Sequence, residues 1–393
     1  MKIIQGISAS VREAEASVIE RVRKKLGLDV SVPVSVYRKS IDARKRSDIK
    51  YVYSFVIETA DDIPNAVNTC DYSFSPEKAY KSARPLVVGM GPAGLFCAYI
   101  LALNGAKPII VERGKDVDRR AEDVQMFWNG GAICPDSNVQ FGEGGAGTFS
   151  DGKLNTGTHD KRMFWVLREF AAHGAPESVT YDAKPHIGTD VLIDVVQNLR
   201  REIISLGGGG RFGSRLDGIV AENGRLTHAL VHTAKGNYTL PCTRLILAIG
   251  HSARDSFEML RDLGLDMERK PFSMGVRIEI DLAQYGRERG ELPPADYSLN
   301  VHLPDGTSAY TFCMCPGGKV FAAASEKGGV VTNGMSYSKR DGENANSALL
   351  VTLHTDDFPG EGVLAGMYWQ REIERRAYNY AGSYRAPAQL VGD

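Results

Sequence analysis

The most informative hydrophobic pattern in this chain lies in residues 86–114. A short apolar run, LVVGM, precedes an apolar stretch of helix-forming residues, AGLFCAYILALNG, and a second apolar run, PIIVERG, follows. Short continuous apolar runs are typical of strands buried on both faces, and a helix between two of them is the usual crossover of a parallel sheet. The pattern therefore predicts an α/β fold around a parallel sheet.

Residues 1–82 predict a separate, small α/β domain. A strand opens this segment, an amphipathic helix follows over about residues 11–26, and two further strands lie near residues 31–37 and 51–57. The stretch DYSFSPEKAYKSARP at its end contains two prolines and little periodic hydrophobicity, which indicates a connecting segment.

The remainder of the chain contains two kinds of pattern. A helix is predicted over residues 190–206, and the four glycines at 207–210 end it in a turn. A buried strand, RLILAIG, then runs to Gly250. From about residue 269 onward short strands and loops predominate, which predicts a β-rich domain separate from the parallel sheet.

Three glycines stand where the first apolar strand meets the helix. Gly89, Gly91 and Gly94 form GMGPAG, a GxGxxG motif. In a dinucleotide-binding unit the first glycine permits a tight turn, the second lets the backbone approach a diphosphate, and the third lets helix and strand pack closely. Pro92 and Ala93 begin the helix, whose N–H groups and positive dipole end favour an anion.

Glu112 ends the second strand, 18 residues after Gly94. An acid at this place can accept hydrogen bonds from the ribose hydroxyls of a dinucleotide, and we expect the adjacent Arg113 to lie beside the cofactor as well. Strand, helix, second strand and terminal acid together predict a dinucleotide site. A glycine turn in an α/β fold without a ligand is the alternative for an isolated motif.

Two further features favour FAD over NAD. The first is the loop at 142–147, GEGGAG, in which the backbone can contact phosphate or an isoalloxazine ring without obstruction by side chains. A flexible surface loop is the alternative. The second is Gly250, which ends a strand that returns the chain to the crevice at the carboxyl edge of the sheet. The expected cofactor positions in the loop are Gly142, Gly144, Gly145, Ala146 and Gly147.

Candidate catalytic residues follow Gly250 directly. His251 has the side chain that titrates closest to working pH, and Arg254 can bind a carboxylate or phosphate with two parallel hydrogen bonds. A histidine that bonds to loop carbonyls, and a surface ion pair between Arg254 and Asp255, are the alternatives.

Cys313 and Cys315 in CMCPGG form a second candidate for chemistry. Two cysteines one residue apart supply at most half of a tetrahedral metal site, and no other Cys or His lies close in sequence, so we expect no metal. A redox-active pair and two small packed thiols both remain open. The six cysteines have uneven spacings, which are not those of a secreted disulfide framework.

Charge and hydropathy limit the partners. A net charge of −1 over 393 residues gives no overall attraction to nucleic acid or anionic membrane. The sequence has neither a secretory signal nor an apolar stretch of membrane-spanning length, so we expect a cytoplasmic protein with no membrane contact. Residues 38–50 carry six basic and two acidic residues, which indicates either a solvated face or a docking surface for nucleic acid.

The sequence also resembles a known family. The segments VVGMGPAGLF, ERG, FGEGGAGTFSDGKLNT, KPHIGTD, LAIGHSARDSF, YTFCMCPGG, TNGMS and RAPAQLVGD are similar to bacterial uncharacterised FAD-dependent dehydrogenases, also labelled NAD(FAD)-utilising dehydrogenases, over nearly the whole chain. The resemblance implies a split FAD-binding domain with an inserted substrate domain and an N-terminal appendage. It places the GxGxxG glycines, Glu112 and the 142–147 loop at the cofactor.

This sequence differs from the family at its C-terminal end. Family members continue beyond PAQLVGD to a further glycine-rich strand and helix that close the FAD site over the flavin, whereas this sequence ends at Asp393. We therefore expect weaker FAD retention than in a complete relative.

Together these features predict an α/β protein of three parts. These are a small N-terminal α/β domain (1–82), a Rossmann-like FAD-binding domain (83–268) and a β-rich substrate-side domain (269–393). The predicted function is that of an FAD-dependent oxidoreductase that passes a hydride between flavin and a small-molecule substrate, with NAD(P)H as a transient donor. A flavin-containing, nucleic-acid-associated protein that uses residues 38–50 is the alternative. The sequence does not indicate the substrate or the oligomeric state.

Overall fold

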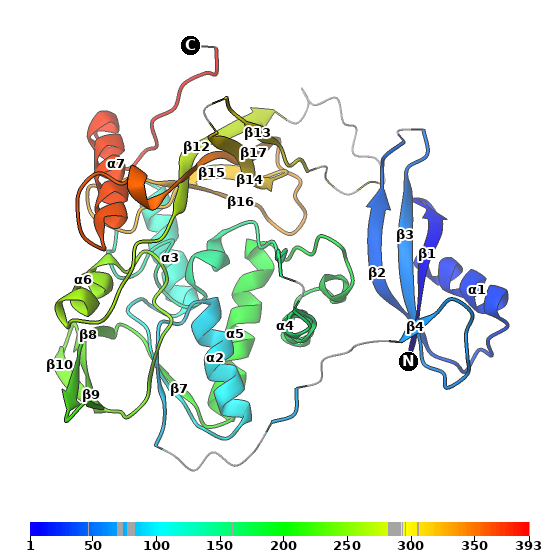
Figure 1. The fold of residues 1–393 in the computed structure, drawn as a ribbon, viewed down its shortest axis with the longest axis horizontal. Helices are drawn as coiled ribbons and strands as arrows, with labels where there is room; N and C mark the ends of the chain where they lie inside the picture. The colour runs from blue at the N-terminus through cyan, green and yellow to red at the C-terminus, as the bar shows by residue number, and fades with distance from the viewer. Residues whose placement is uncertain are drawn as a thin grey trace. The chain divides into compact units, whose positions relative to one another are not determined.

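The structure is a computed structural model, and it divides into two compact units (Figure 1). The smaller unit consists of Met1–Ser75, Lys153–Ile187 and Arg287–Ala295, and the larger unit of Pro76–Gly152, Gly188–Gly286 and Asp296–Asp393. Within these bounds the structure describes residues 1–45, 47–68, 74–76, 83–158, 160–281, 292, 294, 296–304 and 306–392.

The smaller unit is built on an antiparallel sheet that one helix covers. Helix α1 turns the buried side chains of Val18 and Val22 onto Tyr53 and Phe55 of the sheet. The predicted strand, helix and two strands are all present, although the helix begins at Glu15 rather than near residue 11. The sheet has the order β2-β3-β1-β4, and the elements are β1 (Lys2–Ser10), α1 (Glu15–Leu26), β2 (Val34–Asp42), β3 (Lys50–Ile57), β4 (Val67–Asn68), α4 (Arg162–Ala172) and η2 (Glu177–Thr180).

The larger unit contains the predicted parallel sheet. Its four strands have the order β11-β5-β6-β7 and are all parallel, which confirms a mixed α/β fold. Helices α2 and α5 lie side by side along it (Figure 1). The strands are β5 (Leu86–Val88), β6 (Ile109–Val111), β7 (Gly209–Arg211) and β11 (Leu245–Leu247), and the helices are α2 (Pro92–Leu103), α3 (Val117–Trp128) and α5 (Thr189–Ser205).

The prediction of a turn at 207–210 is wrong in part. Gly209 and Gly210 belong to β7 and pair in parallel register with Ile109 and Ile110 of β6. Strand residues usually carry large side chains, and four consecutive glycines are typical of a turn. The sequence pattern therefore did not predict this edge strand.

A three-stranded antiparallel sheet packs against the parallel one. It consists of β8 (Arg215–Glu222), β9 (Arg225–Thr233) and β10 (Gly236–Pro241). Leu216, Val231 and Leu240 of this sheet form one buried cluster with Leu86 and Val111 of the parallel sheet. The cluster buries the two sheet surfaces that face each other. It thereby fixes the end of β5, where the fingerprint begins, and the end of β6, which Glu112 follows.

The β-rich segment after residue 269 is present but does not form a unit of its own. Its strands belong to the same compact unit as the parallel sheet, whereas Lys153–Ile187, predicted inside the FAD-binding domain, groups with the N-terminal strands. It also contains a long helix, α7, that the sequence analysis missed. Its elements are β12 (Phe272–Asp281), β13 (Asn300–His302), β14 (Ser308–Cys315), β15 (Lys319–Ala322), β16 (Thr332–Met335), β17 (Asn344–Leu353), η4 (Thr355–Asp357) and α7 (Ala365–Ala381).

Packing explains two of the three fingerprint glycines. A Cβ on Gly89 would lie 2.4 Å from the carbonyl oxygen of Ala248, and Gly89 has a positive φ of 96°. A Cβ on Gly94 would lie 1.9 Å from the carbonyl oxygen of Gly89. These contacts bring β5, β11 and the start of α2 together, so both glycines are needed for the fold itself.

We therefore expect Gly94→Ala to lower the free energy of unfolding by about 1–3 kcal/mol, because the added methyl group must displace backbone. Gly91→Ala is the matched control: it lies in the same motif, has a φ of −71°, and its Cβ would come no closer than 3.8 Å to another atom. Urea unfolding followed by tryptophan fluorescence measures both. Equal urea midpoints for the two variants would show that the methyl group added at Gly94 does not displace backbone.

Candidate cofactor site

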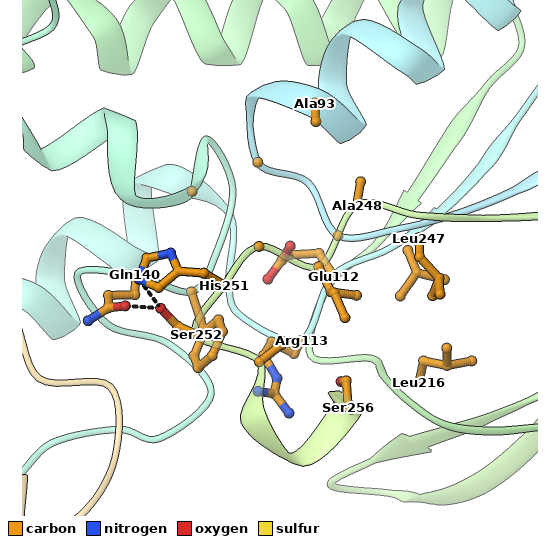
Figure 2. Close-up of a pocket in the computed structure, with 18 of the residues that line it drawn as sticks. Ala93, Glu112, Arg113, Gln140, Leu216, Leu247, Ala248, His251, Ser252 and Ser256 are labelled. Carbon is orange, nitrogen blue, oxygen red and sulfur yellow. Dashed lines mark hydrogen bonds between the residues drawn. The ribbon is translucent and has the colours of Figure 1, made fainter. Parts of the chain in front are cut away.

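A cavity of about 570 Å³ opens at the carboxyl ends of the parallel strands (Figure 2). Its wall comes from the β5–α2 junction, the end of β6, the glycine-rich loop and the chain after β11. Most of the predicted site residues line it: Gly89, Gly91, Pro92, Ala93, Glu112, Arg113, Gly142, Gly145, Ala146, Gly147, Gly250 and His251. Three predicted residues do not line it: Gly94, Gly144 and Arg254.

Gly91 is the fingerprint glycine that protein packing does not explain. Its backbone conformation, φ −71° and ψ −177°, is open to any residue. A Cβ there would have only the Cα of Gly145 within 4 Å, at 3.8 Å, and Gly91 lines the cavity. The lack of a side chain therefore keeps cavity space open next to the first N–H groups of α2, which have no acceptor within the helix. That space suits a diphosphate.

The carboxylate of Glu112 is buried and joins three segments of backbone. It accepts hydrogen bonds from the N–H groups of Met90 (2.7 Å), Gly114 (2.9 Å) and Gly142 (3.0 Å). Glu112, which the sequence predicts to bind a ribose, lines the cavity (Figure 2). Its Oε2 accepts one protein hydrogen bond and keeps a lone pair for a ribose hydroxyl. Glu112 thus has a structural role that its position in the sequence did not reveal.

Arg120 holds the glycine-rich loop from the opposite side, and the sequence analysis missed it. The guanidinium group is completely buried, and burial lowers its pKa to about 10 while Glu112 and Glu143 raise it, so it stays charged at neutral pH. A Cβ on Gly142 would lie 2.4 Å from the Cδ of Arg120, which explains that glycine. The guanidinium donates to the carbonyl oxygens of Asn138 (2.8 Å), Val139 (2.9 Å), Glu143 (2.6 Å) and Gly145 (2.9 Å).

The glycine-rich loop is therefore an ordered part of the wall and not a flexible surface loop. Gly144 donates its N–H to the carbonyl oxygen of Met90 at 2.8 Å, and Gly145 begins a short helical turn, η1 (Gly145–Phe149). A Cβ on Gly145 would lie only 3.0 Å from the Cα of Gly91. The loop thus crosses the start of α2 at backbone contact distance, and its next residues, Ala146 and Gly147, face the cavity.

His251 forms a small polar group with two residues that sequence analysis did not identify. The hydroxyl of Ser252 contacts His251 Nε2 at 3.2 Å and donates to Gln140 Oε1 (Figure 2). The amide of Gln140 is oriented by its bond from Nε2 to the carbonyl of Ala323 (2.6 Å), so Oε1 must accept. Because the hydroxyl has one proton, His251 must donate from Nε2, which leaves Nδ1 as an acceptor.

The electrostatics around His251 favour the neutral imidazole. Although the residue is exposed, desolvation by the surrounding atoms lowers the pKa of His251, and the positive charge of Arg254 lowers it further. Glu374 acts in the opposite direction more weakly. Neutral imidazole with an accepting nitrogen is the form that can take a proton from a substrate.

Arg254 is not placed to bind a substrate, contrary to the prediction. Its guanidinium is buried and binds Glu326 (2.8 Å) and Glu374 (2.6 and 2.9 Å). Burial alone would lower the pKa of Arg254, but these two carboxylates raise it. Asp255, the ion-pair partner suggested by the sequence, instead pairs with Arg113. Arg254 begins α6 (Arg254–Asp262) and fixes the loop that carries His251.

Some of the basic residues at 38–50 form ion pairs within the smaller unit. Arg44 pairs with Asp42, Lys50 with Asp48, and Lys39 with Glu15. Arg46 lies outside the described residues. Asp42 and Asp48 belong to the same segment and are already part of its balance of six basic and two acidic residues, so these pairs leave both the solvated face and the docking surface for nucleic acid open.

Two further features are absent from the described residues. None of the described helices has the length and apolar character needed to cross a membrane. Across the same residues, no three His, Cys, Asp or Glu side chains gather where they could hold a metal ion.

Comparison with known proteins identifies one relative over almost the whole chain. An uncharacterized protein of Clostridium beijerinckii is 44% identical over 413 residues, which cover 99% of this chain and 76% of the relative. Residues 271–393 match the family described as FAD-dependent protein, C-terminal domain-like, and residues 1–58 match a domain of unknown function (DUF8436).

Several solved flavoprotein structures are weakly similar. The FAD complex of glycerol-3-phosphate dehydrogenase from Bacillus halodurans is 12% identical, with a TM-score of 0.36, and the alignment covers 78% of this chain and 54% of that one. The flavin-dependent brominase Bmp2 is 13% identical, with a TM-score of 0.38 and coverage of 78% and 65%. Similarities of this size say nothing about the reaction.

The match of residues 271–393 to an FAD-dependent family confirms FAD as the cofactor and an FAD-dependent oxidoreductase as the class of protein. The site fits this cofactor, because the fingerprint leaves open space at Gly91 and the glycine-rich loop supplies a second backbone wall. The chain belongs to the same family as the uncharacterized Clostridium beijerinckii protein.

Proposed function

We propose that this protein is an FAD-dependent dehydrogenase that passes a hydride between flavin and a small-molecule substrate, with NADH or NADPH as a transient electron donor. The observation that supports it most is the convergence on one cavity of an open fingerprint at Gly91, a backbone wall at 142–147 and a neutral histidine, His251.

FAD, when bound, supplies the two-electron redox chemistry, and the residues of the chain bind and orient it and handle the proton. The main-chain N–H groups at the start of α2 hold the diphosphate, and Glu112 accepts from the ribose through its remaining lone pair. Gly145, Ala146 and Gly147 let the cofactor approach backbone without side-chain obstruction.

His251 is the residue that we assign to proton transfer. Its Nε2 donates to Ser252, so Nδ1 can accept the proton that a substrate releases as its hydride leaves. Gln140 positions Ser252 and, through it, the imidazole. Oxidation of an alcohol or amine needs such a base, and reduction in the opposite direction needs the corresponding acid.

The donor assignment rests on the sequence. Of the stretches that fit GxGxxG, GMGPAG is the one that joins a strand to a helix and has an acid at the end of the next strand, so a second nicotinamide-binding domain is not evident, and NAD(P)H would bind transiently at the flavin face. Visible spectra with FAD, followed by anaerobic addition of NADH, NADPH and dithionite, test this. We expect bleaching by at least one nicotinamide. Bleaching by dithionite alone would contradict the donor assignment, and absence of bound flavin would contradict the whole proposal.

Gly91→Val tests the placement of the diphosphate. The valine side chain would fill the cavity space beside the N–H groups of α2, so we expect the Kd for FAD to rise at least about tenfold, equivalent to about 1.4 kcal/mol. Gly91→Ala should give a smaller increase. Fluorescence titration of FAD measures Kd, and thermal unfolding without FAD checks that the fold is retained. Unchanged affinity in Gly91→Val would place the diphosphate elsewhere.

The pH dependence of turnover tests His251. A neutral base is lost on protonation, so we expect kcat/KM to fall at low pH with a midpoint below 6.5, since the pKa of His251 is lowered from that ordinary value. His251→Gln should remove this acid limb and lower kcat about 10²–10⁴-fold.

His302→Gln is the control for that measurement, because His302 is exposed on β13 and does not line the cavity. It should leave the profile unchanged. An acid limb that persists in His251→Gln would assign the base to another group.

A further inference from the structure

Two thiols lie against each other at the end of β14, outside the cofactor cavity. The register of β14 on β17 shifts between Phe312 and Cys315, which marks a β-bulge. At this bulge the Sγ atoms of Cys313 and Cys315 are 4.0 Å apart. The bulge interrupts the regular alternation of side chains and brings the two sulfur atoms into contact.

Arg277 of β12 places a positive charge on the inner sulfur. Its Nη2 lies 3.3 Å from Cys315 Sγ and donates to the carbonyl oxygen of Cys313 at 2.8 Å. Its Nε donates to the Oδ1 of the fully buried Asn346 at 2.7 Å, which orients the guanidinium. A cation at hydrogen-bond distance favours the thiolate, which is the nucleophilic form of cysteine.

Gly334 of β16 leaves the space that this guanidinium occupies. A Cβ on Gly334 would lie 2.2 Å from Arg277 Nη2 and 2.2 Å from Asn346 Oδ1. The glycine has no positive φ to account for it, so the close approach of the guanidinium explains its identity. Strands β14, β16 and β17 therefore surround the guanidinium of Arg277 and hold it against Cys315 Sγ.

The two thiols differ in access to solvent. Cys315 is completely buried, whereas Cys313 is half-buried. Cys313 also has a φ of 48°, a left-handed conformation that costs a non-glycine residue roughly 1–2 kcal/mol. A small oxidant can therefore reach Cys313, while Cys315 can act only on a partner already bound to Cys313.

We propose that Cys313 and Cys315 are a reversible dithiol–disulfide pair that exchanges with small disulfides of the glutathione class. The Cys313 thiolate attacks one sulfur of the oxidised disulfide and releases the first small thiolate. Cys315 then attacks the Cys313 sulfur, which forms the Cys313–Cys315 bond and releases the second. The protein loses two electrons and two protons, and one disulfide becomes two thiols.

Equilibration of the purified protein in buffers of reduced and oxidised glutathione tests the pair, with alkylation of remaining thiols and mass spectrometry of the peptides. We expect a peptide that has lost two hydrogens and contains Cys313 and Cys315, while Cys97 and Cys242 remain alkylated under the same conditions. The readout does not need bound FAD or turnover, so it is independent of the proposed function. Equal alkylation of Cys313, Cys315 and Cys97 at every ratio would overturn the proposal.

Two cysteine variants distinguish the order of attack. Cys315→Ser should accumulate glutathione on Cys313, because no second thiol resolves it, and Cys313→Ser should leave Cys315 unmodified. The opposite pattern, with glutathione on Cys315, would contradict the assigned roles.

Arg277→Met tests the positioning role of the guanidinium. It should slow closure of the disulfide at least about tenfold once glutathione is bound, and Arg277→Lys should recover part of the rate. A rate equal to that of the unaltered protein would remove Arg277 from the proposal. Circular dichroism of the reduced variants shows that the fold is retained.

Discussion

The cofactor site depends on one buried carboxylate that three backbone segments share. Glu112 accepts hydrogen bonds from the N–H groups of Met90 in the fingerprint loop, Gly114 after its own strand and Gly142 in the glycine-rich loop. Hydrogen bonds to a charged group contribute about 1.5–3 kcal/mol each, so the loss of this carboxylate would weaken all three segments at once. Arg120 acts from the other side by binding four carbonyl oxygens, and together the two side chains hold the glycine-rich loop at the start of α2.

A second network, centred on the buried Arg254, fixes the chain after β11, where His251 lies. Arg254 binds Glu326 and Glu374, and Arg371 of α7 binds Glu326 and Glu258. These charges connect α6 to α7 and to the turn after β15. Removing one partner of such a network leaves a buried charge uncompensated, so the network specifies one arrangement of these elements. Asp151 makes a similar connection from the end of the glycine-rich loop to Ser336 and Arg340.

Local sequence patterns were sufficient to predict the part of the site that backbone forms. Two of the fingerprint glycines, Glu112 and most of the 142–147 loop line the cavity, because strand, turn and helix signals are local. Arg120, Gln140 and Ser252 could not be found in this way. Their roles come from partners far along the chain, such as Ala323 for Gln140, and a charged residue within a helix ordinarily indicates a solvated face. Arg254 was misassigned for the same reason, since Glu326 and Glu374 lie 72 and 120 residues away.

We infer that main-chain N–H groups at the β5–α2 junction hold the diphosphate of FAD. A crystal structure of the FAD complex tests it most directly. We expect diphosphate oxygens within hydrogen-bond distance of the N–H groups at the start of α2, with a ribose hydroxyl on Oε2 of Glu112. A diphosphate bound elsewhere, with this junction filled by protein atoms, would contradict it.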